Sequence, residues 1–235
     1  MVALLLDLMT LGPKGMWRSV TGVLLALVLS ACTSKQVIVQ GNFPKPLLEP
    51  LPLTLALLYP DAFINHEFYD EAKGRNESEW LVKTGDAQVE FWDTLFNGMF
   101  TKVVHIRSHE DLHAYEQEVD AVLIPKVDEL QYTIPLHTSV KVYEIWMRYR
   151  FRLVELEAIH NHADGSLSFN PADSIADWTL TAYGKTPTAF LQSDETAVNM
   201  AAVVALRDAG AHFVTRFDKV PDVASWLETA LVGSP

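Results

Sequence analysis

Residues 140–157 read VKVYEIWMRYRFRLVELE, and along this stretch large apolar side chains alternate with polar ones. Because successive side chains of a β-strand point to opposite faces of a sheet, this alternation predicts one long, half-buried strand. The core face would carry Tyr143, Ile145, Met147, Tyr149, Phe151 and Leu153, and the opposite face Glu144, Trp146, Arg148, Arg150 and Arg152. The stretch therefore predicts a sheet that is covered on one face.

The segments around this strand complete the fold prediction. The chain turns near Asp164-Gly165, and residues 175–183 (IADWTLTAY) follow as the second strand of a hairpin with an irregular loop. Strands are also expected at residues 53–59, 102–106 and 121–125, and helices at residues 85–100, 194–215 and 223–231, with Ser193 as an N-cap. This order predicts an α+β fold, a mixed β-sheet with a long antiparallel hairpin and helices packed on one face.

The N-terminal part has the layout of a secretory signal. Arg18 precedes an apolar run at residues 20–29, and small residues follow before Cys32. The run is shorter than the roughly 20 residues that a transmembrane helix needs. Residues 1–15 fit this layout poorly because Asp7 interrupts their apolar character, so Met16 is an alternative start.

The signal ends in Leu29-Ser30-Ala31-Cys32, which resembles a bacterial lipobox. The resemblance implies that the Cys32 thiol is acylated with chains such as palmitate and that Cys32 becomes the new N-terminus. Cys32 is the only cysteine of the chain, so the mature protein forms no internal disulfide. Thr33 stands where an aspartate would resemble an inner-membrane retention signal. We therefore expect the protein to be anchored in the inner leaflet of the outer membrane, with its domain in the periplasm.

These features divide the chain into three expected parts. Residues 1–31 are a signal peptide, residues 32–52 are lipidated Cys32 followed by a proline-rich tether, and residues 53–235 are a single periplasmic α+β domain. The tether could instead be an arm that docks on a partner, since Leu47, Leu48 and Leu51 interrupt its polar character.

The segment His109-Glu110-Asp111-Leu112-His113 matches the H-E-x-x-H zinc pattern. However, a charged residue lies between the histidines, the helix must be short, and no third ligand follows at the expected spacing. Ser108 and Asp111 match a capping box instead. We therefore expect a capped connector helix without a metal. His160 and His162 are a second possible metal pair, but they lie in a polar loop and we expect water, not a metal, around them. His66, His105, His137 and His212 show no converging ligand spacing.

Arg148, Arg150 and Arg152 form a basic ladder on the predicted outer strand face. They are candidates for docking an anionic partner or a lipid headgroup. The alternative is that they pair across the hairpin with Asp173 or Asp177.

The net charge of -12 argues against nucleic acid as a partner. No nucleophile elbow, phosphate loop or dinucleotide fingerprint is present, so no enzyme activity and no cofactor are expected. The order of elements, with phrases such as VDAVLIP at residues 119–125, resembles small periplasmic auxiliary lipoproteins of envelope assemblies. That resemblance implies an accessory or scaffolding role. The protein would attach to the membrane through its N-terminal lipid and bind another protein of the cell envelope.

Two other functions remain open. One is a zinc-dependent periplasmic hydrolase that uses His109, Glu110 and His113. The other is a carrier that holds an apolar ligand between sheet and helices, against the aromatic face of Tyr143, Tyr149 and Phe151.

Overall fold

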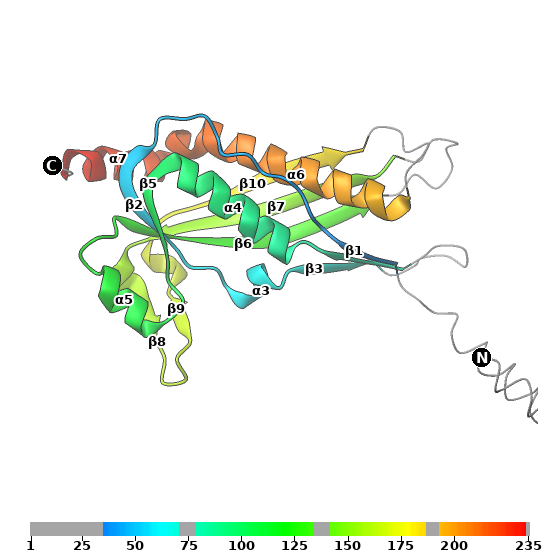
Figure 1. Ribbon diagram of the computed structural model, residues 1–235. Coiled ribbons are helices and arrows are strands. Elements are labelled where there is room, and N and C mark those ends of the chain that lie inside the picture. The colour runs from blue at the N-terminus through cyan, green and yellow to red at the C-terminus, as the bar shows by residue number, and fades with distance from the viewer. Residues whose placement is uncertain (1–34, 71–78, 134–141, 187–192, 234–235) are drawn as a thin grey trace, which may run out of the picture.

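The computed structural model describes residues 35–70, 79–133, 142–186 and 193–233. Its central sheet has five strands in the order β10 (Ser174–Lys185), β7 (Glu144–Val154), β6 (Ala121–Thr133), β2 (Leu51–Leu57) and β5 (Phe100–His105) (Figure 1). β2 runs parallel to β5 and β6, whereas β7 runs antiparallel to β6 and β10. The sheet is therefore mixed, and the predicted α+β class is confirmed.

Strand β7 carries the alternation that the sequence shows. All six side chains predicted for its core face are almost fully buried, with Tyr143 just before the strand. The intervening side chains alternate with them as intermediate or exposed positions. Pairing with β6 on one side and β10 on the other places β7 in the antiparallel half of the sheet.

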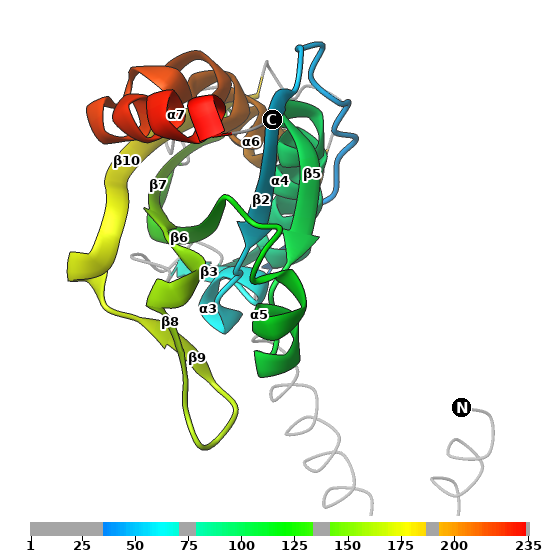
Figure 2. The same ribbon diagram turned by 90° about the vertical axis from the view of Figure 1, so that its left-hand side faces the viewer.

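Three helices cover the core face: α4 (Gly85–Met99), α6 (Asp194–Arg216) and α7 (Pro221–Gly233) (Figure 2). The N-cap prediction for α6 is confirmed, because the Ser193 hydroxyl accepts a hydrogen bond from the Thr196 backbone N–H at 3.2 Å. Trp92 of α4 packs edge-on against Phe151, with ring centroids 5.0 Å apart, and also against Phe213 of α6. Helix side chains therefore pack directly against the aromatic face that the carrier hypothesis names, and a ligand held between sheet and helices stays a prediction.

The remaining elements form two small sheets and short helices. β1 (Lys35–Ile38) pairs parallel with β4 (Trp80–Lys83), which pairs antiparallel with β3 (Glu67–Asp70). β8 (Ile159–Asn161) and β9 (Leu167–Phe169) form a hairpin. The short helices are α3 (Asp61–Ile64), α5 (His109–Tyr115) and the 3-10 turns η1 (Leu156–Ala158), η2 (Pro171–Asp173) and η3 (Phe217–Lys219). Among the described residues, no helix has the length and apolar character needed to cross a bilayer.

The domain begins earlier than the expected boundary at residue 53. Lys35 to Ile38 form β1, and Val37, Val39 and Phe43 are buried in the main core. The physical reason is the alternation of Val37 and Val39, which places both side chains on the covered face of a strand beside β4. The first part of the segment expected as a tether, residues 35–43, therefore packs on the domain, whereas Leu47 and Leu48 are exposed.

Strand β6 is longer than the predicted strand at residues 121–125. It continues through Pro125 to Thr133 and pairs with β7 along this length, with a register shift between Val127 and Glu129. The Leu123 carbonyl accepts a hydrogen bond from the Leu58 N–H, so the backbone groups of Leu123 face β2. Backbone groups two residues apart in a strand face the same neighbour, so the nitrogen of Pro125, which has no hydrogen to donate, faces this side too. β2 has ended there, and proline is tolerated where no ladder partner is present.

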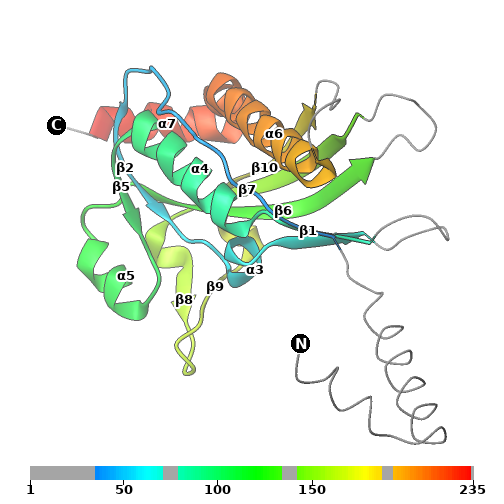
Figure 3. The same cartoon turned by 45° about the vertical axis from the view of Figure 1, so that its right-hand side comes forward.

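The turn near Asp164-Gly165 is real, but it closes a different hairpin. Gly165 has a φ of 82° and lies between β8 and β9, which project from the main sheet (Figure 3). Strands β7 and β10 still pair as expected, and β8 and β9 are inserted between them.

Candidate functional site

An open groove of about 860 Å³ lies beyond the carboxyl ends of β2 and β5. Helix α3, the end of β5 and the β8–β9 hairpin line it, and α3 and this hairpin lie on the side of the sheet away from α6 and α7 (Figures 2 and 3). Apolar lining side chains include Leu58, Ile64, Val89, Leu167 and Phe169, and polar ones include Tyr59, His105, Arg107 and Ser168. We call this feature the groove.

The groove exists because the sheet packs on both faces near its parallel strands. In β2, Leu55 and Leu57 belong to the main core, whereas Ala56 belongs to a second apolar cluster with Val122 and Ile124 of β6. Helix α5 and the β8–β9 hairpin cover this second cluster through Leu112 and Phe169, among others. Since short elements cover this face, space remains between them and α3.

Two polar side chains in the wall of the groove, Tyr59 and His105, meet at the carboxylate of Asp93. The Tyr59 hydroxyl donates to Asp93 Oδ1 at 2.8 Å, and His105 Nε2 lies 3.4 Å from the same oxygen. The rings of Tyr59 and His105 contact each other edge-on at 5.5 Å. Burial, and then the Asp93 charge and hydrogen bond, raise the pKa of Tyr59 far above its usual range. Tyr59 therefore acts as a neutral donor that holds Asp93 beside His105.

The β8–β9 hairpin forms the opposite wall. Ser168 Oγ lies 2.6 Å from His162 Nε2, and the Asp164 carboxylate accepts from the Ser166 N–H and hydroxyl across the turn. The Arg152 guanidinium stacks over the Phe169 ring at 5.5 Å. These contacts fix a short hairpin whose apolar face, Leu167 and Phe169, points into the groove.

The chemistry of the groove is that of a binding site. Ligand sites in proteins are concave, about 300–1,000 Å³ in volume and mostly apolar with a few placed polar groups. The groove has that volume, a largely apolar lining, and the polar lining groups Tyr59 and His105, which both contact Asp93. Within the described residues, no group of three or more histidine, cysteine or acidic side chains could hold a metal ion.

No sequence motif marks this site. Tyr59 follows β2, Asp93 lies in α4 and His105 ends β5, so no short motif contains them. The one available signal was that Tyr59 and His105 end or follow strands, because ligand sites in sheets with parallel strands lie beyond their carboxyl ends. That signal needs the strand order, which the sequence does not provide.

The predicted capped helix is confirmed as α5. Ser108 accepts from the Asp111 N–H, and the Asp111 carboxylate accepts from the N–H groups of Arg107 and Ser108 at 2.8 and 3.0 Å. His109 and His113 lie on its exposed side with their Nε2 atoms 3.0 Å apart. The helix has only seven residues, unlike the long buried helix of a zinc protease.

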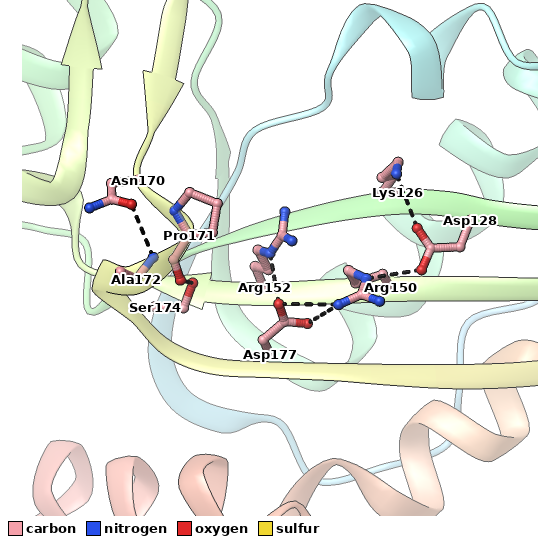
Figure 4. A network of polar contacts seen from close by, with 9 residues as sticks. All are labelled: Lys126, Asp128, Arg150, Arg152, Asn170, Pro171, Ala172, Ser174 and Asp177. Carbon is pink, nitrogen blue, oxygen red and sulfur yellow. Dashed lines mark hydrogen bonds and ion pairs between the residues drawn. The ribbon is translucent and has the colours of Figure 1, made fainter.

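The arginine ladder pairs with carboxylates on both neighbouring strands, and Figure 4 shows the pairs made by Arg150 and Arg152. Arg150 contacts Asp128 at 2.9 Å and Asp177 at 3.2 Å, Arg152 contacts Asp177 at 2.9 Å, and Arg148 pairs with Glu129. Although burial opposes it, hydrogen bonds from Arg150 and Lys126 lower the pKa of Asp128. Arg150 and Arg152 thus pair across the hairpin with Asp177, as one of the two alternatives predicts. The other alternative, docking of an anionic partner by this ladder, stays a prediction.

The other predicted residues do not converge on one site. His160 is an exposed residue of β8, His212 lies 2.9 Å from the Thr181 carbonyl, and His66 lies 2.7 Å from the Thr84 hydroxyl. Cys32, the signal peptide and His137 lie outside the described residues.

No protein-family model matches this sequence, and a search of curated proteins gave no significant match. Among solved structures, a Xanthomonas campestris protein of the DUF330 family is 12% identical, covering 82% of this chain and 98% of its own, with a TM-score of 0.47. A minor lipoprotein from Acinetobacter baumannii is 13% identical (72% and 92% covered, TM-score 0.32). A lipoprotein from Neisseria meningitidis is 14% identical (66% and 97% covered, TM-score 0.24). At these values, function must come from the chain's own features.

Proposed function

We propose that this chain is a lipid-anchored accessory protein of a bacterial envelope assembly, without catalytic activity, which faces the periplasm from the outer membrane. The motif Leu29-Ser30-Ala31-Cys32 supports the anchor. The groove supports the accessory role, because it offers an apolar surface large enough for a partner's side chains.

The observation that carries the proposal is the short separation between Cys32 and the fold. β1 begins at Lys35, so only Thr33 and Ser34 intervene. Three residue steps span at most about 10 Å of extended chain. A domain held so closely keeps one end toward the bilayer. Lys35 Nζ contacts Asp194 at 3.0 Å, which places the start of α6 at that same end.

The β8–β9 hairpin, which lines the groove, lies toward the other end of the long strands, away from β1 (Figure 1). Ile124 lines the groove, and Thr133 ends β6 beside Glu144, the first residue of β7. The nine residue steps between them correspond to roughly 30 Å of strand. Anchoring through Cys32 therefore directs the groove away from the bilayer, where an envelope partner can insert an apolar segment.

The anchor is tested with a Cys32→Ser variant. Wild-type protein should incorporate labelled palmitate and sediment with outer membranes, and the variant should do neither. A Thr33→Asp variant should keep the label but move to inner-membrane fractions. A Cys32→Ser protein that remains labelled and membrane-bound would overturn the anchoring proposal.

The accessory role is tested by crosslinking in intact cells. Ile64 in the groove and Leu231 on α7 are both 39% exposed, so they form a matched pair. Ile64→Arg should abolish the crosslink to an envelope partner, and Leu231→Arg should retain it. Equal crosslinking by both variants would remove the groove from the interaction.

A small apolar ligand is the alternative occupant, since about 860 Å³ lies within the usual range of ligand pockets. Native mass spectrometry of wild-type protein distinguishes the two. A bound lipid-sized mass that is lost in Ile64→Arg would favour the carrier function over the accessory one.

A further inference from the structure

Two histidines on α5 are arranged as a pair that the groove does not use. His109 and His113 stand one helical turn apart, with their Nε2 atoms 3.0 Å apart and their ring centroids 4.4 Å apart at an interplanar angle of 75°. The His113 side chain is 67% exposed. Both rings thus direct a ring nitrogen to the same point at the surface.

The fold fixes this pair in place. The capping box of Ser108 and Asp111 sets the first turn of α5. Leu112 and Tyr115 pack against the second apolar cluster, so the helix cannot rotate without exposing them. Residues four apart on a helix lie on one face, which here is the face turned to solvent.

The distance between the nitrogens matches a chelate. A metal bound to two imidazoles at 2.0–2.1 Å with a ligand angle near 95° places those nitrogens about 3.0 Å apart. We propose that His109 and His113 chelate one late first-row divalent cation, such as Zn²⁺, Ni²⁺ or Cu²⁺, with water in the remaining positions. The Irving–Williams order then ranks Cu²⁺ above Ni²⁺ and Zn²⁺.

The surroundings favour a cation. Glu116 Oε2 lies 4.0 Å from His113 Nδ1, which favours a proton on Nδ1 and leaves Nε2 free as the ligand. The chain as a whole is also negatively charged, with a net charge of -12.

This site differs from a catalytic zinc centre in a testable way. In a zinc protease the glutamate of the motif is the general base and a third protein ligand completes the site. In the proposed chelate Glu110 is a first-turn acid with no contact to the metal. With only two protein ligands, binding should be reversible and readily removed by a chelator.

The test is isothermal titration of the full-length protein in detergent with ZnCl₂, NiCl₂ and CuCl₂. Wild type should bind one equivalent, and His109→Ala or His113→Ala should weaken binding roughly 100-fold, because the second, intramolecular contact is lost. Glu110→Gln and His160→Ala should bind as wild type does. Absence of a stoichiometric site, or loss of binding in Glu110→Gln, would overturn the proposal.

Electron paramagnetic resonance of the Cu²⁺ complex gives an independent measurement. The wild-type spectrum should show coupling to two imidazole nitrogens, and each single variant to one. Circular dichroism of the variants checks that they fold. Two-nitrogen coupling that persists in His109→Ala would place the metal elsewhere and refute the assignment.

Discussion

Asp93 is the residue on which the wall of the groove depends, because its one oxygen serves both Tyr59 and His105. The carboxylate is about one-third exposed, so water solvates the side that the two partners leave open. Tyr59, whose raised pKa keeps it protonated, donates whether or not His105 carries a charge. The hydrogen bond from the Tyr59 hydroxyl to Asp93 therefore persists in either charge state of His105.

Tyr59→Phe should lower the free energy of unfolding by about 1 kcal/mol, because it deletes one hydrogen bond while keeping the ring. Tyr115→Phe is the matched control, since the Tyr115 ring packs on the second apolar cluster and its effect should be close to zero. Urea unfolding at pH 7 measures both. Equal stability of Tyr59→Phe and wild type would show that the hydroxyl contributes nothing to the wall.

His66 should make stability fall with acidification. Burial lowers its pKa from the ordinary value of 6.5, outweighing the opposing charge of Glu67. The unfolded chain therefore binds the proton first, so stability is complete above about pH 6.5 and declines as the pH falls below it. Urea unfolding between pH 7.5 and 5.5 should show this decline, and His66→Asn should reduce its slope. An unchanged slope would assign the decline to other groups.

At the scale of elements, most helices and strands follow from local pattern. The alternation in β7 and the apolar face of α4 are strong signals because a single face of each is buried. The capping box of Ser108 and Asp111 can also be predicted from the sequence, because its two residues lie only three positions apart. Local signals of this kind require no knowledge of the sheet order.

The elements that the sequence missed depend on distant partners. β1 is a strand because β4, more than 40 residues later, pairs with it. β6 passes through Pro125 because β2 has already ended on that side. Likewise, Asp128 and Glu129 become partners of the arginine ladder only when β6 extends beyond Pro125. The groove is harder still, since its polar cluster combines three elements.

Contact between α6 and β10 depends on Gly184. A Cβ at this position would lie 1.9 Å from the Ala201 carbonyl oxygen and 2.4 Å from the Ala205 nitrogen. Gly184→Ala should therefore push α6 from the sheet and destabilise the protein by about 3 kcal/mol, at the upper end for overpacking. The comparison is Gly165→Ala, which meets no atom within 4 Å and strains only a φ of 82°. It should cost about 1 kcal/mol. If thermal unfolding shows that Gly184→Ala destabilises the protein less than Gly165→Ala does, the close packing of α6 on β10 is contradicted.

At the scale of the whole molecule, the strands that cross it separate two ends with different surroundings. The first strand and the start of α6 meet at one end, where Lys35 contacts Asp194. Helix α5 and the β8–β9 hairpin, which lines the groove, lie toward the other end (Figure 1). The proposed lipid at Cys32 can orient the domain only if β1 transmits that attachment to the core, so the stability of β1 determines whether the proposed anchor fixes an orientation.

Removing β1 should therefore cost most of the stability of the domain. Val37, Val39 and Phe43 are each at least 93% buried, at relative exposures of 4%, 1% and 7%. Burying three such side chains contributes roughly 5–9 kcal/mol, comparable to the total of about 5–15 kcal/mol for a typical domain. A chain that starts at Lys35 should unfold cooperatively in urea, whereas one that starts at Pro44, with β2 intact, should be largely unfolded. If both chains unfold at the same urea concentration, β1 is a loosely held arm and the anchor leaves the groove free to turn in any direction.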